Sequence, residues 1–309
     1  MIYKKAIFLL ILIIFLFFLI WYFMTNSINK SLSYLDNNYN KTTIYEDNYL
    51  KFIYPEENLP LNLTYRKIDA YTNLIYIDKE LGKDKTKKIN YQIEEANNNL
   101  NSLIPYFENK STFNTIKNVS DGYALDTYCI LGHLFNNTKI ANNIKGLIIN
   151  DNLMQDNYYK EDKWRNIADE TWCILLLNNI NKNVASALTD IKINETYNFL
   201  NSQNTIQDKA VVLIHIILLT NELNHDNGYF KNELYQLSLN DEIKNDILIK
   251  ANILYVLAES NYPKEKLKPI YESLIEKQHK DGGVYLISNY GNAFITQRAI
   301  LAINAYESL

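Results

Sequence analysis

Two segments of this chain repeat each other at a spacing that few folds produce. Ala124 to Leu131 reads ALDTYCIL, and Ala168 to Leu175, about 44 residues later, reads ADETWCIL. Repeats of about 40–47 residues are typical of stacked helical hairpins, in which each unit buries its apolar face against the next. The repeat therefore predicts an all-α chain built from helix pairs.

Two classes of helix alternate along the sequence. Strongly apolar segments recur at 66–81, 206–222, 242–259 and 291–306, which with the two repeats above makes six. More charged, amphipathic segments lie between them, at 87–104, 138–150, 184–201, 229–238 and 263–278. This alternation predicts six inner helices shielded from water by outer ones. A sixth outer helix is missing by this count, and either residues 41–60 or the end of the N-terminal apolar run is a candidate for its place.

The N-terminus carries a membrane signal. Residues 6–24 are uncharged and almost wholly apolar, and as a helix they span about 29 Å, the thickness of a hydrocarbon core. Lys4 and Lys5 precede this run, which favours a cytoplasmic N-terminus. We therefore expect a cytoplasmic tip at 1–5, a transmembrane signal anchor at 6–24 that contacts membrane lipid, a polar stalk at 25–60 and an extracytoplasmic repeat domain at 61–309. A cleaved signal peptide is the rival interpretation, but the run is longer than usual for one.

Composition narrows the choice of partners. The formal net charge is −4, and the Lys residues are scattered among acidic ones, so we expect no nucleic-acid binding. An exported domain permits one disulfide between the only two cysteines, Cys129 and Cys173. Seven Asn-x-Ser/Thr sequons would also suit an exported domain, although Asn is so common here that chance explains most of them: Asn29, Asn40, Asn62, Asn109, Asn118, Asn136 and Asn194.

One stretch near the C-terminus resembles a known repeat. Leu274 to Tyr285 contains Gln278 and the turn Asp281-Gly282-Gly283, and an apolar segment follows from Thr296. This is similar to the repeat of protein prenyltransferase β subunits and squalene-cyclase-type enzymes, where Gln ends an outer helix and Asp-Gly-Gly-Trp leads into an inner one. The resemblance implies an α/α toroid of about six helical hairpins. The repeat length also fits a HEAT-like α-solenoid, which stays as the alternative.

The motifs that carry activity in those families are missing. Val284 stands where the family has Trp, and the sequence has neither an Asp-x-Asp-Asp string nor an Asp-x-Cys pair. The resemblance therefore implies a fold rather than an activity, and we expect no cofactor.

Candidate site residues gather at the N-terminal ends of the inner helices. Acidic candidates for general acid and base are Asp126, Asp169, Glu170 and Asp208. Candidate ligand-binding residues are the aromatic Tyr128, Trp164 and Trp172 and the cationic Lys250 and Arg298. Acids in a first helical turn also complement the helix dipole without any further role. Asp126, Cys129 and His133 share one helix face, but they are spaced too widely for one metal ion, so no metal is expected.

These observations leave three functions open. The first is a membrane-anchored helical toroid that binds a glycan, lipid-linked or peptide ligand without evident catalysis. The second is an enzyme of the same fold that acts on a polysaccharide or isoprenoid substrate. The third is an open solenoid that serves as a scaffold.

Overall fold

The computed structural model describes residues 15, 27–38, 65–108, 122–150, 163–284 and 293–309. Every regular element within these ranges is helical, apart from an isolated antiparallel bridge between Gln278 and Val284. Six helices correspond to the apolar class: α2 (Tyr65–Leu81), α6 (Gly122–Leu134), α8 (Lys163–Asn178), α10 (Ile206–Glu222), α13 (Ile247–Glu259) and α15 (Ala293–Ser308). The amphipathic class comprises α4 (Asn90–Phe107), α7 (Thr138–Asn150), α9 (Lys182–Leu200), α11 (Gly228–Ser238) and α14 (Lys264–Glu276). The all-α prediction is confirmed.

Three short helices lie between these elements in the described ranges. They are α3 (Lys83–Thr86), the 3₁₀ helix η4 (Lys87–Ile89) and α12 (Asp241–Lys244). The expected apolar helix over 242–259 is split, because the side chain of Asp246 accepts a hydrogen bond from the backbone N–H of Ile249 and so starts α13 afresh. Thr205 and Asn181 cap α10 and α9 in the same way.

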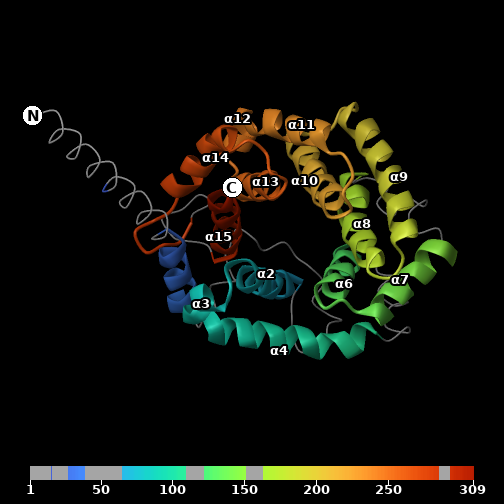
Figure 1. Cartoon of the computed structure of the whole chain (residues 1–309), viewed down its shortest axis with the longest axis horizontal. Helices are drawn as coiled ribbons and strands as arrows, with labels where there is room; N and C mark the ends of the chain where they lie inside the picture. The colour runs from blue at the N-terminus through green and yellow to red at the C-terminus, as the bar shows by residue number, and fades with distance from the viewer. Residues whose placement is uncertain (1–14, 16–26, 39–64, 109–121, 151–162, 285–292) are drawn as a thin grey trace, which may run out of the picture.

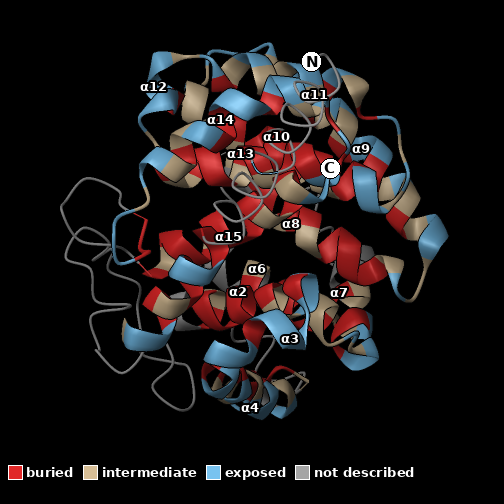
Figure 2. Cartoon of the chain, turned by 60° about the vertical axis from the view of Figure 1, so that its left-hand side comes forward, coloured by how far each residue is buried: buried red, intermediate tan, exposed pale blue. Residues whose placement is uncertain are grey.

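Each apolar helix packs against two other apolar helices. Each of α2, α6, α8, α10 and α13 packs against the next in this series, and α15 packs against both α13 and α2. Figure 1 shows these six helices around the centre of the molecule, with the amphipathic helices outside them. Each amphipathic helix contacts the apolar helix before it and the apolar helix after it. Buried residues concentrate on the inner layer, and exposed residues lie on the outer helices (Figure 2).

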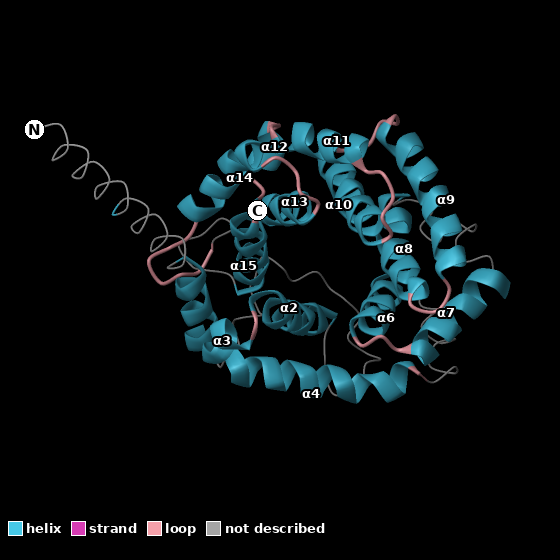
Figure 3. Ribbon diagram, viewed as in Figure 1, coloured by secondary structure: helices cyan, strands magenta, loops and turns pink. Residues whose placement is uncertain are grey.

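Residues 27–38, which were expected to belong to a polar stalk, instead form a helix in the outer layer (Figure 3). Ile28, Leu32 and Leu35 are buried in the main hydrophobic core. Their spacing of four and then three residues makes one apolar face of a helix. The abundance of Asn and Ser around them hides this pattern. This helix takes the place of the missing sixth outer helix, and residues 39–60 lie outside the described ranges.

The turn after α14 holds this N-terminal helix. The Gln278 side-chain amide donates to the carbonyl of Ser27 and to the hydroxyl of Ser31, each at 2.8 Å. The Ser31 hydroxyl donates in turn to the carbonyl of Gly282 at 2.8 Å. Segments 251 residues apart in sequence thus close the outer layer.

This turn requires glycine at position 282. Its φ is +94°, and a Cβ at this position would lie 2.0 Å from the carbonyl oxygen of Lys30. A side chain there would be strained and would also collide with the N-terminal helix.

Three inner helices end in an asparagine in the left-handed conformation. Asn136, Asn224 and Asn261 have φ of 48°, 57° and 55° and follow α6, α10 and α13. After each one, the next residue's N–H returns to a carbonyl inside the helix, as from Asn137 to Gly132 at 2.8 Å. This is the Schellman arrangement, which usually employs Gly. Asn serves instead in a chain with only 8 glycines.

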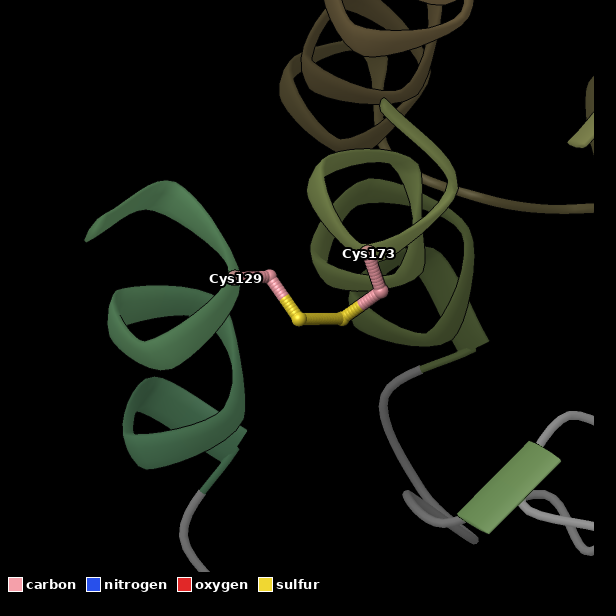
Figure 4. Close-up of a disulfide and its surroundings, with 2 residues drawn as sticks. All are labelled: Cys129 and Cys173. Carbon is pink, nitrogen blue, oxygen red and sulfur yellow. A yellow bond between two sulfur atoms is a disulfide. The ribbon is translucent and has the colours of Figure 1, made fainter. Parts of the chain in front are cut away.

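A disulfide joins two neighbouring inner helices. Cys129 of α6 and Cys173 of α8 are bonded, with their Cα atoms 4.8 Å apart (Figure 4). They occupy equivalent positions in the two sequence repeats, 44 residues apart. Equivalent side chains of adjacent repeats therefore meet, as expected where successive helical hairpins stack side by side.

The expected anchor at 6–24 lies, except for Phe15, outside the described residues. None of the helices in the described ranges combines the length and the apolar character needed to cross a bilayer.

Replacement of Gly282 by Ala should lower the free energy of unfolding by more than about 1–3 kcal/mol, because strain at a positive φ adds to the collision with Lys30. Urea unfolding provides the measurement. Gly146→Ala in α7 is the matched control, since its Cβ would meet no atom within 4 Å, and it should stabilise by about 0.5–1 kcal/mol. Equal effects of the two substitutions would contradict the proposed role of the turn.

Removal of the disulfide with the double variant Cys129→Ala and Cys173→Ala should lower the free energy of unfolding by about 4 kcal/mol, the loop-closure value for a loop of 44 residues. Addition of a reductant should destabilise the wild type to a similar degree. The double variant should not respond to the reductant. A wild type that is equally stable with and without it would show that the bond contributes nothing.

Candidate functional site

All six inner helices contribute side chains to one central cavity of about 170 Å³. The polar and aromatic residues that line it are Asp69, Thr72, Asn73 and Tyr76 of α2, Asp126 of α6, Trp172 of α8, His215 of α10, Asn252 and Tyr255 of α13, and Arg298 of α15. Apolar side chains complete the wall: Ile130, Ile214, Leu218, Val256 and Leu301. Three of the nine predicted site residues, Asp126, Trp172 and Arg298, meet here.

Two polar atoms in this cavity lack an internal partner. Within the described residues, Oδ1 of Asp126 and Nε of Arg298 are enclosed and make no hydrogen bond. Such groups are costly to bury unless water or a ligand satisfies them, at about 1–3 kcal/mol each. The cavity is therefore suited to a polar occupant.

The surroundings of Asp126 favour its neutral form. Burial raises the pKa of the Asp126 carboxyl well above its ordinary value, and the nearby Asp169 and Asp69 carboxylates raise it further. The Arg298 guanidinium opposes this shift. Burial lowers the pKa of Arg298 itself, while the charge of Asp69 counteracts the effect. The charge of Asp69 thus favours the ionised form of Arg298 and the neutral form of Asp126.

Aromatic rings and a neutral histidine form other parts of the wall. Burial raises the pKa of Tyr76 to about 12 and also raises the pKa of Tyr255, so both hydroxyls stay protonated. His215 Nδ1 lies 2.8 Å from the carbonyl oxygen of Val211 and donates to it. Burial lowers the pKa of His215, so the ring is neutral and its Nε2 is an acceptor.

The other predicted acids do not line the cavity. Glu170 faces the outer layer, where the buried Lys192 of α9 pairs with both Glu170 and Glu195, the latter at 2.6 Å. Burial raises the pKa of Glu170 to about 7 despite Lys192, whereas the two carboxylates raise the pKa of Lys192 despite its burial. Asp208 lies in the first turn of α10, where acids complement the helix dipole. The charge of Asp169 raises the pKa of Asp126.

Three predicted ligand-binding residues lie between packed helices instead of lining the cavity. Tyr128 is fully buried, and its hydroxyl donates to the carbonyl of Phe107 and accepts from the Asn143 amide at 3.2 Å. Trp164 packs on a small cluster of Ile167, Phe199 and Val212. The Lys250 ammonium donates to the Ser273 hydroxyl of α14 at 2.5 Å. Each belongs to the interior between helices rather than to the cavity.

Sequence reasoning missed Asp69, Tyr76, Asn252 and Tyr255. A signal for them was present: Asp69, Asn73 and Tyr76 follow the helical spacing i, i+4, i+7 within an otherwise apolar segment. Polar residues on one face of a buried helix mark the side that meets a cavity. No group of three metal-binding side chains occurs within the described ranges, and Cys129, once considered as a ligand, is held in the disulfide.

Replacement of Asp126 by Asn should change how stability depends on pH. Because the folded pKa of Asp126 lies above its unfolded value, the wild type is most stabilised by this group below about pH 4 and loses that contribution as the pH rises through the folded pKa. Asp126→Asn should therefore gain stability relative to the wild type between pH 4 and pH 8, as measured by urea unfolding across that interval. A constant difference would mean that Asp126 titrates normally.

The resemblance to prenyltransferases and cyclases rests on the turn around Gly282 and on the alternation of helices. Comparison of the chain with protein-family models, with curated proteins and with solved structures finds no match. Membership of that family therefore stays a prediction.

Proposed function

We propose that this chain is a closed α/α toroid, held at the outer face of the cell membrane by residues 6–24, that binds one sugar ring of a glycan or of a lipid-linked saccharide in its central cavity. The observation that carries the proposal is the central cavity to which all six inner helices contribute side chains. The contact between α15 and α2 favours the closed arrangement over an open solenoid, in which the first and last inner helices would lie apart.

The size and wall of the cavity support a sugar. A volume of about 170 Å³ holds roughly six water molecules and slightly exceeds the roughly 150 Å³ of a cavity that binds benzene, so it is comparable to one six-membered ring. Trp172, Tyr76 and Tyr255 offer aromatic faces from three helices, and such faces pack well on apolar ring surfaces. With Asp126 neutral and Asp69 balanced by Arg298, the lining has little net charge, which suits a neutral polar ligand better than an ionic one.

The disulfide supports the proposed location. Disulfides persist in oxidising compartments and are rare in the cytosol. A buried bond between Cys129 and Cys173 accordingly agrees with a domain outside the cytoplasm, as do the lysines before residue 6.

An enzyme acting on a glycan is the second candidate, and Asp126 is the observation that favours it. A carboxyl kept neutral by burial inside a ligand-sized cavity can protonate a glycosidic oxygen, while Asp69, another carboxylate of the same lining, can act as base or nucleophile.

Binding is tested with the full chain in detergent micelles, titrated with monosaccharides and screened on immobilised glycans. Because Trp172 lines the cavity, a bound sugar should change its fluorescence. Trp172→Ala should weaken binding at least tenfold, about 1.4 kcal/mol, and Arg298→Gln should weaken it similarly. Tyr91→Phe, at an exposed outer position, is the control.

Unchanged affinity in both cavity variants would place the ligand elsewhere and contradict the proposal. Release of a new reducing end from a soluble oligosaccharide incubated with the chain, lost in Asp126→Asn while binding is retained, would favour the enzyme over the binder.

A further inference from the structure

One of the turns between an inner and an outer helix presents a modification motif to solvent. Asn136 follows α6 in the left-handed conformation, and its N–H donates to the carbonyl of His133 at 3.1 Å. It begins the sequon Asn136-Asn137-Thr138, and both Asn136 and Thr138 are exposed. A folded acceptor needs its asparagine and its hydroxyl residue accessible together, and this turn meets both conditions.

The middle residue of the sequon holds the turn in place. The Asn137 side-chain oxygen accepts hydrogen bonds from the backbone N–H groups of Lys139 and Ile140, at 3.1 and 3.0 Å, and so caps α7. Its amide donates to Glu108 at 2.9 Å. Because Asn137 makes these contacts, the two reactive positions on either side of it are not needed to cap the helix.

The other two sequons in the described ranges have their hydroxyl residues occupied. The hydroxyl residue of the Asn29 sequon is Ser31, which is fully buried and donates to the carbonyl of Gly282. Asn194 lies within α9, and the hydroxyl residue of its sequon is Thr196. Thr196 is fully buried and donates to the carbonyl of Lys192 at 2.8 Å. Neither sequon is open to an enzyme in the folded domain.

We propose that Asn136 is an N-glycosylation site. In the transfer, the Asn136 amide nitrogen bonds to the anomeric carbon of an oligosaccharide carried on a lipid diphosphate. The bond from that carbon to the phosphate oxygen breaks, the diphosphate leaves with the electron pair, and the amide proton passes to a base of the cell's transferase. The inference rests on the proposed extracytoplasmic location, but it does not depend on the ligand of the central cavity.

The test expresses the full chain in cells that carry out N-glycosylation, with an Asn-Gly-Thr tag added after Leu309 as a reporter of topology. Peptide mass spectrometry after removal of N-glycans then reads the occupancy of each sequon. Asn136 should be occupied in most molecules and at least tenfold more than Asn194. Thr138→Ala should abolish occupancy at Asn136, whereas Thr138→Ser should retain it.

A transplanted sequon tests the role of the turn itself. Asn224 has the same left-handed conformation after α10, and both Asn224 and Asp226 are exposed. Asp226→Thr completes a sequon there and should make Asn224 a new acceptor. An occupied reporter with an empty Asn136, or equal occupancy at Asn194, would overturn the proposal. An unmodified reporter together with an unmodified Asn136 would overturn the membrane orientation and the modification site with it.

Discussion

The inner helices carry apolar side chains on almost every face, and this constraint shapes the whole domain. In α13, Ala251, Ile253 and Val256 are almost fully buried although they point in different directions around the helix. Such a helix is stable only if other protein covers it on all sides. The neighbouring inner helices cover two sides, and the amphipathic helices cover a third. The fourth side faces the centre, so the central cavity is what remains once the other faces are packed.

The periodicity of the sequence predicted the helices well, because burial imposes it directly. The range 206–222 coincides with α10, and the range 138–150 coincides with α7. Local chemistry decided the ends that were missed: Asp246 caps α13 and so separates it from α12. The helix of residues 27–38 was missed because its apolar face comprises few residues among many polar ones. Its partner, the turn around Gly282, lies at the opposite end of the chain.

The candidate site was harder to predict, since position along a helix does not determine direction around it. Asp126 and Glu170 both lie in the N-terminal halves of inner helices, yet Asp126 meets the cavity and Glu170 meets Lys192 of the outer layer. An angular difference on the helix surface separates a candidate ligand-binding group from a structural ion pair. Such buried pairs contribute little net stability, but breaking one leaves an uncompensated charge. From the sequence alone, Asp126 and Glu170 were equally good candidates for the site.

The N-terminal helix of residues 27–38 has a consequence for synthesis. It leaves the ribosome early, whereas Gln278 and Gly282, which hold it, are added about 250 residues later. At 5–20 residues per second, the delay is on the order of tens of seconds. Lys88 and Gln92, which bond to Ser33 and Asp36, follow only 55 and 56 residues later, but the side of the helix that meets the Gln278 turn stays uncovered for this time, and exposed apolar surface promotes aggregation. The burial of this helix is therefore completed only when the last hairpin emerges, and until then a chaperone that covers its open side would protect the nascent chain.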